Sequence, residues 1–193
     1  MNKVVEQTEI MGSDNPNLGI KGKRERNKAA NRAAIMAAAM SCFTELGYES
    51  VTVRDIIRKT SLASGTFYNY FRDKDEIFRA LLEEHMSAMT ARTHEARQSA
   101  QNLEQFLKQS FLAAFTMIVE DPIFYKLVMR NEAVIREHYE DRILGVSMAS
   151  LIEDVEDAQR RGIIPPESSG MDVEYLSAAF FGVAYEMGRV LSR

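Results

Sequence analysis

The sequence predicts an all-α protein. Apolar residues recur at three- and four-residue spacing in one segment after another, as they do on the buried face of a helix. Pairs of polar residues three positions apart precede several of these segments, which is typical of helix N-termini. The 193 residues contain no alternating run long enough to predict a strand and no internal repeat.

The first helix is predicted over about residues 27–46. Its apolar side chains, from Ile35 to Leu46, share one face at helical spacing. Cys42 lies within this face, where we interpret it as a small core residue rather than a nucleophile. Gly47 is a natural residue just past a helix end.

Two short helices are predicted next. Thr52 and Asp55 have the spacing of a capping box, so the second helix is expected to begin at Thr52. Residues 60–63 form a tight polar turn, and the third helix is expected over about residues 64–70.

Longer helices are predicted for the rest of the chain. Each start carries a capping signal: Asp73 with Glu76, Asn102 with Gln105, Asp121 with Pro122, and Ser169 with Asp172. The helix after Asp73 is expected to end near residue 96, and the last helix to run to the C-terminus. A stop signal ends the helix before it, consisting of Arg160, Arg161, Gly162, Pro165 and Pro166.

The third helix has small or hydroxylated side chains first and aromatic ones after them. Ser64, Gly65 and Thr66 begin it, and Phe67 and Phe71 follow. A helix that enters the major groove of DNA needs small side chains where it approaches the bases and apolar ones where it packs on the protein. Gly65 costs about 1 kcal/mol relative to Ala within a helix, and close approach to DNA is one reason to tolerate it.

Other polar side chains complete the candidate DNA-contacting set. Asn69 is a possible reader of adenine, and Thr66 could contact a base edge or a thymine methyl group. Tyr68 and Lys74 are expected at phosphates, as is Thr52 at a helix N-terminus. The alternative is a small helical subdomain that merely has a polar face.

The charge distribution favours an anionic partner for the N-terminal side. The net charge is −4, but residues 21–74 hold 11 Lys and Arg against 5 Asp and Glu, whereas residues 75–193 hold 12 against 20. Residues 1–28 are predicted to form a disordered tail and basic arm. Either a solvated helix start or contacts to DNA would explain the arm's cations, which include Lys23, Arg24 and Lys28.

Several function classes are not expected. There is one cysteine, no signal-peptide core and no apolar run of about 18 residues, which favours a cytoplasmic protein without membrane partners. No Gly-rich phosphate loop, nucleophile motif or paired acid–base arrangement predicts an enzyme, and no cofactor is implied. The three histidines have no metal-ligand spacing with acidic partners, so no metal is expected.

The stretch over about residues 27–80 resembles the tetracycline-repressor-like (TetR/AcrR) family of prokaryotic transcription regulators. The resemblance depends on the following residues: Phe43, Leu46, Gly47, Thr52, Ile56, Gly65-Thr66-Phe67-Tyr68-Asn69-Tyr70-Phe71, Lys74 and Phe78. It departs from the family pattern at Ser61 and Ala63, where a turn glycine and a capping Ser or Thr are usual. Ser61 or Ser64 could take over the cap, whose loss would cost about 1 kcal/mol.

The resemblance implies a domain arrangement and a function. It implies a three-helix DNA-binding domain over residues 29–89, with its helix-turn-helix motif at 52–71, and a larger helical ligand-binding and dimerisation domain over 90–193. It also implies a homodimer that contacts a palindromic operator in double-stranded DNA and responds to an unidentified small molecule. The residues matching the family's DNA contacts are Thr52, Ser64, Gly65, Thr66, Tyr68, Asn69 and Lys74.

Candidate ligand and dimer residues come from the C-terminal half. An apolar or aromatic ligand could be lined by Phe106, Phe111, Phe115, Phe124, Tyr125, Met129, Arg130, Phe181 and Tyr185, although an aromatic stripe at helical spacing is usually plain core. Small residues on the last two helices could form a two-fold contact, with Ser147, Ser150, Ala178, Phe181, Gly182 and Tyr185 as candidates.

A ligand-released repressor is therefore the leading hypothesis. The alternative is an architectural or division-control protein of the same fold with no small-molecule inducer. A C-terminal core without a cavity would favour the alternative.

Overall fold

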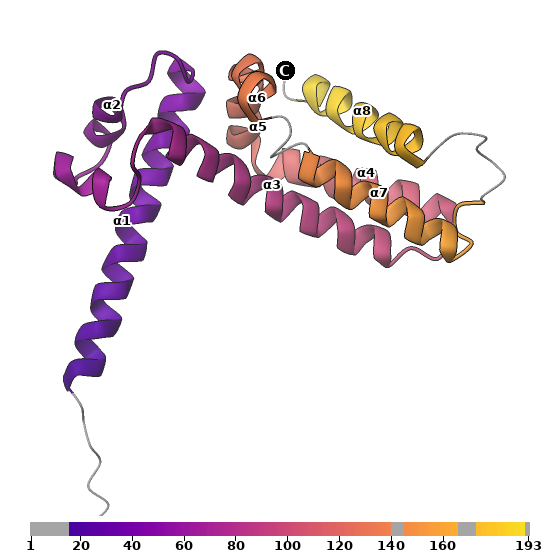
Figure 1. Cartoon of the computed structure of the whole chain (residues 1–193), viewed down its shortest axis with the longest axis horizontal. Helices are drawn as coiled ribbons and strands as arrows, with labels where there is room; N and C mark the ends of the chain where they lie inside the picture. The colour runs from indigo at the N-terminus through magenta and orange to yellow at the C-terminus, as the bar shows by residue number, and fades with distance from the viewer. Residues whose placement is uncertain (1–15, 140–144, 166–172, 192–193) are drawn as a thin grey trace, which may run out of the picture.

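The computed structural model describes residues 16–139, 145–165 and 173–191 of the chain. Every regular element in these ranges is helical, which confirms the all-α prediction (Figure 1). The elements are α1 (Pro16–Leu46), α2 (Val53–Arg58), the 3-10 helix η1 (Ser64–Asn69), α3 (Lys74–Gln98), α4 (Leu103–Glu120), α5 (Pro122–Arg130), α6 (Glu132–Tyr139), α7 (Gly145–Arg160) and α8 (Val173–Leu191).

Local chemistry sets the predicted helix starts. Thr52 forms the full capping box with Asp55, and Asp73, Asn102 and Asp121 each accept a hydrogen bond from the amide three residues on. The predicted cap at 169–172 lies outside the described residues.

Two glycines end helices in the left-handed region. Gly47 follows α1 with φ +82°, and Gly162 follows α7 with φ +70°. Residues with a Cβ rarely adopt this conformation, so both positions favour glycine as the residue past a helix end.

Helix α1 is longer than predicted. It begins at Pro16, so residues 16–28, expected in a disordered tail, are helical. Proline suits the first turn of a helix, and the Lys, Arg and Glu residues that follow are good helix formers. The sequence offers no strong breaker before residue 27 and only the mild cost of Gly19 and Gly22.

The molecule has two packed regions, and helix α3 runs through both of them. At one end α2 and η1 lie beside α1, and α3 starts among them and runs across to pack against α4 and α7 (Figure 1). Helix α8 covers α4 and α7, while α5 contacts α1. Helix α3 therefore belongs to both regions, with Lys74 in its first turn.

Each region has its own buried core. The first is built around Phe43, Phe67 and Phe78, and Leu127 of α5 is buried in it as well. The second gathers Phe106 and Val155 with neighbours from α7 and α8. The α5–α6 segment therefore packs partly on the core of the N-terminal region.

Asn131 joins the two regions through hydrogen bonds. This residue, between α5 and α6, is 3% exposed. Its Oδ1 accepts from the amide of Tyr48 at 2.6 Å, and its Nδ2 donates to the carbonyl oxygens of Phe43 at 3.1 Å and Leu127 at 2.7 Å. One buried amide thus connects the C-terminal end of α5 to the C-terminal end of α1.

Candidate DNA interface and effector cavity

Helix η1 has an exposed polar face and a buried aromatic back. Ser64, Gly65 and Asn69 are exposed and Tyr68 is 62% exposed, while Phe67 is fully buried. The ring centroids of Phe67 and Tyr68 lie 5.4 Å apart, so the Tyr68 ring is packed on one side while most of the side chain faces solvent. This arrangement presents Asn69, one predicted base-contacting residue, on the outside, while Thr66, the other, is half-buried.

The start of η1 differs from the predicted capping. Its N-cap residue is Ala63 and no side chain caps the helix, so neither Ser61 nor Ser64 replaces the missing cap. Instead the Thr66 amide donates to the Ala63 carbonyl at 2.8 Å, which begins a tight 3-10 turn. Gly65 has no packing reason to be glycine, because a Cβ there would meet no atom within 4 Å.

Thr52 stands exposed at the start of α2 but is already engaged. Its amide and its hydroxyl both donate to Oδ2 of Asp55, at 3.0 and 2.5 Å. These hydrogen bonds hold the pKa of the Asp55 carboxyl below its ordinary value, since they favour the charged form. A phosphate would have to share Thr52 with this carboxylate.

Lys74 is held by the loop that precedes α2. Its Nζ donates to the carbonyl oxygens of Tyr48 at 2.9 Å and Glu49 at 3.4 Å, and lies 4.4 Å from the centroid of the Tyr48 ring. Its predicted phosphate contact therefore requires the ammonium group to share or exchange these partners. The same loop is held by Asn131, so Lys74 lies next to the junction of the two regions.

The predicted basic arm is the exposed N-terminal part of α1. Lys23, Arg24 and Lys28 are all exposed, and none forms an ion pair with any residue that the structure describes. The arm projects away from the rest of the molecule (Figure 1). Cations without carboxylate partners on a projecting helix are suited to contact phosphates.

The C-terminal region encloses a cavity of about 180 Å³. Five of the predicted ligand residues line it, namely Phe111, Phe124, Tyr125, Phe181 and Tyr185. The other four do not. Phe106 is buried in the core below, Phe115 and Met129 are half-buried elsewhere, and Arg130 is exposed near Gly47.

Sequence reasoning missed the contribution of α3 to the cavity. Met86, Met89, Thr93 and Arg97 all line it. They recur at three- and four-residue spacing, so they share one face of α3. The sequence signal that indicates this wall is one face of α3 on which a threonine and an arginine follow two methionines.

The two tyrosines of the cavity are tied to their surroundings. Tyr125 donates to the carbonyl of Tyr185 at 3.2 Å, and Tyr185 donates to Glu132 at 2.7 Å. Burial raises the pKa of Tyr125 to about 12, so its hydroxyl stays protonated at neutral pH. The hydrogen bond from Tyr185 holds the pKa of Glu132 below its ordinary value, with Arg136 acting in the same direction.

Three predicted dimer residues face their own subunit. Phe181 and Tyr185 line the cavity, and Ser147 lines it while its hydroxyl bonds that of Thr90 at 2.9 Å. This differs from their expected place in a two-fold contact. Ser150 is half-buried beside a groove between α3 and α7.

The outer side of α8 carries the remaining dimer candidates. Ala178 and Gly182 are exposed there. Large apolar side chains surround them on the same helix and are exposed by 44% to 70%, namely Tyr175, Val183, Met187 and Val190.

Two further findings limit the chemistry of the described residues. Among them, no group of three or more His, Cys, Asp or Glu side chains is arranged to hold a metal ion. None of the described helices is both long enough and apolar enough to cross a membrane.

The helical fold with its exposed η1 defines a helix-turn-helix protein. Residues 35–81 match the family described as "Bacterial regulatory proteins, tetR family". The match covers the segment from the middle of α1 to the first part of α3, which holds α2 and η1.

Individual relatives are more distant. The HTH-type transcriptional repressor Rv1474c of Mycobacterium tuberculosis is 39% identical over 67 residues, which cover 35% of this chain and 36% of that protein. The HTH-type transcriptional repressor KstR2 of the same species is 26% identical over 76% of this chain and 69% of its own length. The chain thus spans about a third of the first relative.

Solved structures share the fold over about four fifths of the chain. The fatty acid degradation regulator FadR from Bacillus halodurans superposes with a TM-score of 0.69 at 22% identity, over 81% of each chain. FadR from Bacillus subtilis, in complex with stearoyl-CoA, superposes with a TM-score of 0.68 at 23% identity, over 81% of this chain and 84% of that one.

Proposed function

We propose that this chain is a homodimeric transcriptional repressor that leaves a palindromic operator when a small apolar or aromatic molecule fills its cavity. The observation that carries the proposal is η1, whose residues Ser64–Asn69 are largely exposed while Phe67 behind them is fully buried. A helix whose one face is packed on the protein core and whose opposite face is exposed can enter the major groove without rearrangement.

The surroundings of η1 support DNA as the partner. The exposed arm cations Lys23, Arg24 and Lys28 belong to the N-terminal part of the chain, residues 21–74, which carries an excess of positive charge. Gly65 is needed neither for packing nor for a positive φ, which is consistent with a backbone that must approach another molecule closely. Rv1474c and KstR2 are both named transcriptional repressors.

The exposed face of α8 supports a dimer. Several exposed apolar side chains on one surface mark an interaction site, and small residues among them let two helices approach closely. A two-fold axis through this surface would bring two copies of η1 into one molecule. Their spacing would be about 34–36 Å, or a multiple matched to the operator.

The cavity supports control by a ligand. Its walls are mostly apolar side chains of α3, α4, α5, α7 and α8. Helix α3 extends from these walls to Lys74, so a ligand that moves α3 would shift the N-terminal region relative to its partner copy. The coupling is expected to be about 1–3 kcal/mol, or a roughly 5–150-fold change in operator affinity.

The cavity also weighs against the alternative of an architectural protein without an inducer, which predicted a filled core. An enzymatic role has no support in the sequence, since no catalytic motif is present there. A DNA-binding regulator is accordingly preferred over both.

Titration of fluorescent DNA duplexes tests the proposal. The purified chain should bind DNA from the region upstream of its own gene more tightly than scrambled DNA. Lys74→Ala should weaken binding to all sequences and flatten its salt dependence, because it removes a cation from a phosphate. Tyr68→Ala should weaken binding to all sequences with an unchanged salt dependence, because its hydroxyl is neutral. Lys108→Ala is the matched control, because it removes the same charge from an exposed site on α4.

DNA contact by η1 and induction by a ligand are refuted by different results. Equal affinity for every duplex, with no effect of Tyr68→Ala or Lys74→Ala relative to Lys108→Ala, would refute η1 as the DNA-contacting element. An operator affinity that stays unchanged with every cavity-binding molecule would refute induction alone.

A further inference from the structure

The cavity has an uneven distribution of polar groups. Its lining includes Thr90, Thr93, Arg97, Ser110 and Ser147 toward the C-terminal half of α3, whereas most of the other lining residues are apolar. Apart from Arg97 and the tyrosines, the titratable residues in the lining are His85 and Asp121, whose side chains contact each other at 3.2 Å. The cavity therefore combines a mostly apolar body with a larger polar group around Arg97 and a smaller one at His85 and Asp121.

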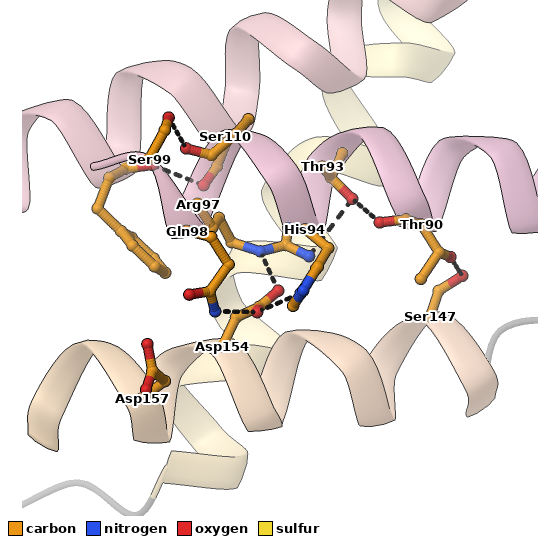
Figure 2. Close-up of polar contacts among 12 residues, drawn as sticks. Thr90, Thr93, His94, Arg97, Gln98, Ser99, Ser110, Ser147, Asp154 and Asp157 are labelled. Carbon is orange, nitrogen blue, oxygen red and sulfur yellow. Dashed lines mark hydrogen bonds and ion pairs between the residues drawn. The ribbon is translucent and has the colours of Figure 1, made fainter.

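A buried ion pair forms the base of the polar group around Arg97. Arg97 and Asp154, from α3 and α7, have side chains that are 7% and 1% exposed, and Nε of Arg97 donates to Oδ2 of Asp154 at 2.7 Å (Figure 2). The other oxygen, Oδ1, accepts from His94 at 2.6 Å and Gln98 at 3.1 Å. Asp154 is thus fully occupied by three donors, and it does not itself line the cavity.

Arg97 retains donor capacity. Its Nη2 donates to the hydroxyl of Thr93 at 3.3 Å. Within the part of the chain that the structure describes, its Nη1 makes no hydrogen bond. A guanidinium carries five N–H groups in a rigid fork, so one edge can hold Asp154 while another binds a second acceptor.

The hydroxyl groups at this end are already directed by the protein. Thr93 donates to the carbonyl of Met89 at 2.9 Å, Ser110 donates to that of Phe106 at 2.6 Å, and Thr90 and Ser147 bond each other at 2.9 Å. These hydroxyl groups supply a polar lining. The strongest donor with an unused N–H group at this end of the cavity is Arg97. A buried cationic donor selects an acceptor, and it selects an anionic acceptor most strongly.

The size and shape of the cavity limit the rest of the ligand. An engineered apolar cavity of about 150 Å³ holds benzene, so 180 Å³ accommodates an apolar body of about six to ten carbons. His85 and Arg97 both line the cavity and are twelve residues apart on α3, which corresponds to about 18 Å along the helix. An elongated space beside flexible methionines favours a straight chain over a rigid ring.

We propose that the effector is a straight-chain monocarboxylic acid of about six to ten carbons, with its carboxylate on Arg97 and its alkyl chain along α3. This inference rests on the proposed function, because it names the ligand class of the same cavity. Stacked His85 and Phe124, whose ring centroids lie 4.3 Å apart, would close the end of the site opposite Arg97.

Calorimetric titration of the full chain with octanoate tests the inference. Octanamide and 1-octanol are the matched probes, since they keep the alkyl chain and replace the charged head. Octanoate should bind at least about tenfold more tightly than either, because only its head carries a charge opposite to that of Arg97. Arg97→Lys should weaken octanoate binding by about tenfold and leave 1-octanol binding unchanged, since a lysine lacks the forked donors.

A second variant guards against misfolding at the buried pair. Ala184 lines the cavity, and Ala184→Leu fills part of it without touching Arg97 or Asp154. Octanoate binding should then fall at least about tenfold, while the circular dichroism spectrum stays that of the wild type. Octanoate binding that survives Ala184→Leu, or that is no tighter than 1-octanol binding, would overturn the inference.

The two proposals can fail separately. Specific DNA binding without octanoate binding would overturn only the ligand class. Octanoate binding that depends on Arg97, in a protein that binds no duplex, would support the ligand class and overturn the regulatory function.

Discussion

Replacement of Asn131 by alanine should destabilise the whole molecule, because this amide joins its two regions. The change removes the acceptor of the buried Tyr48 amide, which costs about 1–3 kcal/mol when such a donor loses its acceptor. It also removes the two donations from Nδ2. Those acceptors lose less, because the Phe43 carbonyl still accepts from Gly47 and the Leu127 carbonyl from the backbone of residue 131.

The expected loss is about 2–4 kcal/mol in the free energy of unfolding. Urea denaturation followed by circular dichroism measures it at neutral pH. Asn131→Asp should be at least as destabilised, because it keeps an acceptor for Tyr48 but places a carboxylate against two carbonyl oxygens. Asn69→Ala is the control: Asn69 is exposed on η1, so its loss should cost at most about 0.5 kcal/mol. A loss below about 1 kcal/mol for Asn131→Ala would refute the role of this residue as the junction.

Three other perturbations have defined outcomes. Gly188→Ala should cost about 1–3 kcal/mol in urea unfolding, because its Cβ would lie 2.8 Å from Cζ of Tyr125; a loss below about 0.5 kcal/mol would contradict this packing. The pKa of Glu132 is lowered by Tyr185, so its contribution to stability is present above its ordinary pKa of 4.5 and lost as pH falls through the lowered value. The difference in urea midpoint between wild type and Tyr185→Phe should therefore shrink on acidification, and a constant difference would exclude the linkage. Gly65→Ala should leave the unfolding midpoint unchanged or slightly raised yet weaken DNA binding at least about tenfold, and unaltered DNA binding would mean that no close approach occurs there.

Helix starts were predictable because their chemistry is local. Thr52, Asp73, Asn102 and Asp121 each bond an amide three residues away, so a short stretch of sequence contains both partners. The exposed face of η1 was predictable for the same reason, since small residues precede aromatic ones within eight positions. The start of α1 was not, because a polar segment without a strong breaker is compatible with both coil and helix.

The cavity was only partly predictable. Aromatic residues on α4, α5 and α8 suggested it, but the Arg97–Asp154 pair joins residues far apart in the chain, and no local pattern links them. Likewise α8 is apolar on more than one side. Periodicity alone could not tell that Phe181 and Tyr185 face the cavity while Ala178 and Gly182 face outward.

Selection of preferred sites from a pool of random duplexes, with wild type and Asn69→Ala side by side, tests the central claim most directly. If the exposed end of η1 contacts base pairs, the wild type selects a palindrome and the variant loses or changes its preference at the same position in both half-sites. A variant that selects the wild-type sequence with uniformly lower affinity, or a wild type that selects none, would contradict the account.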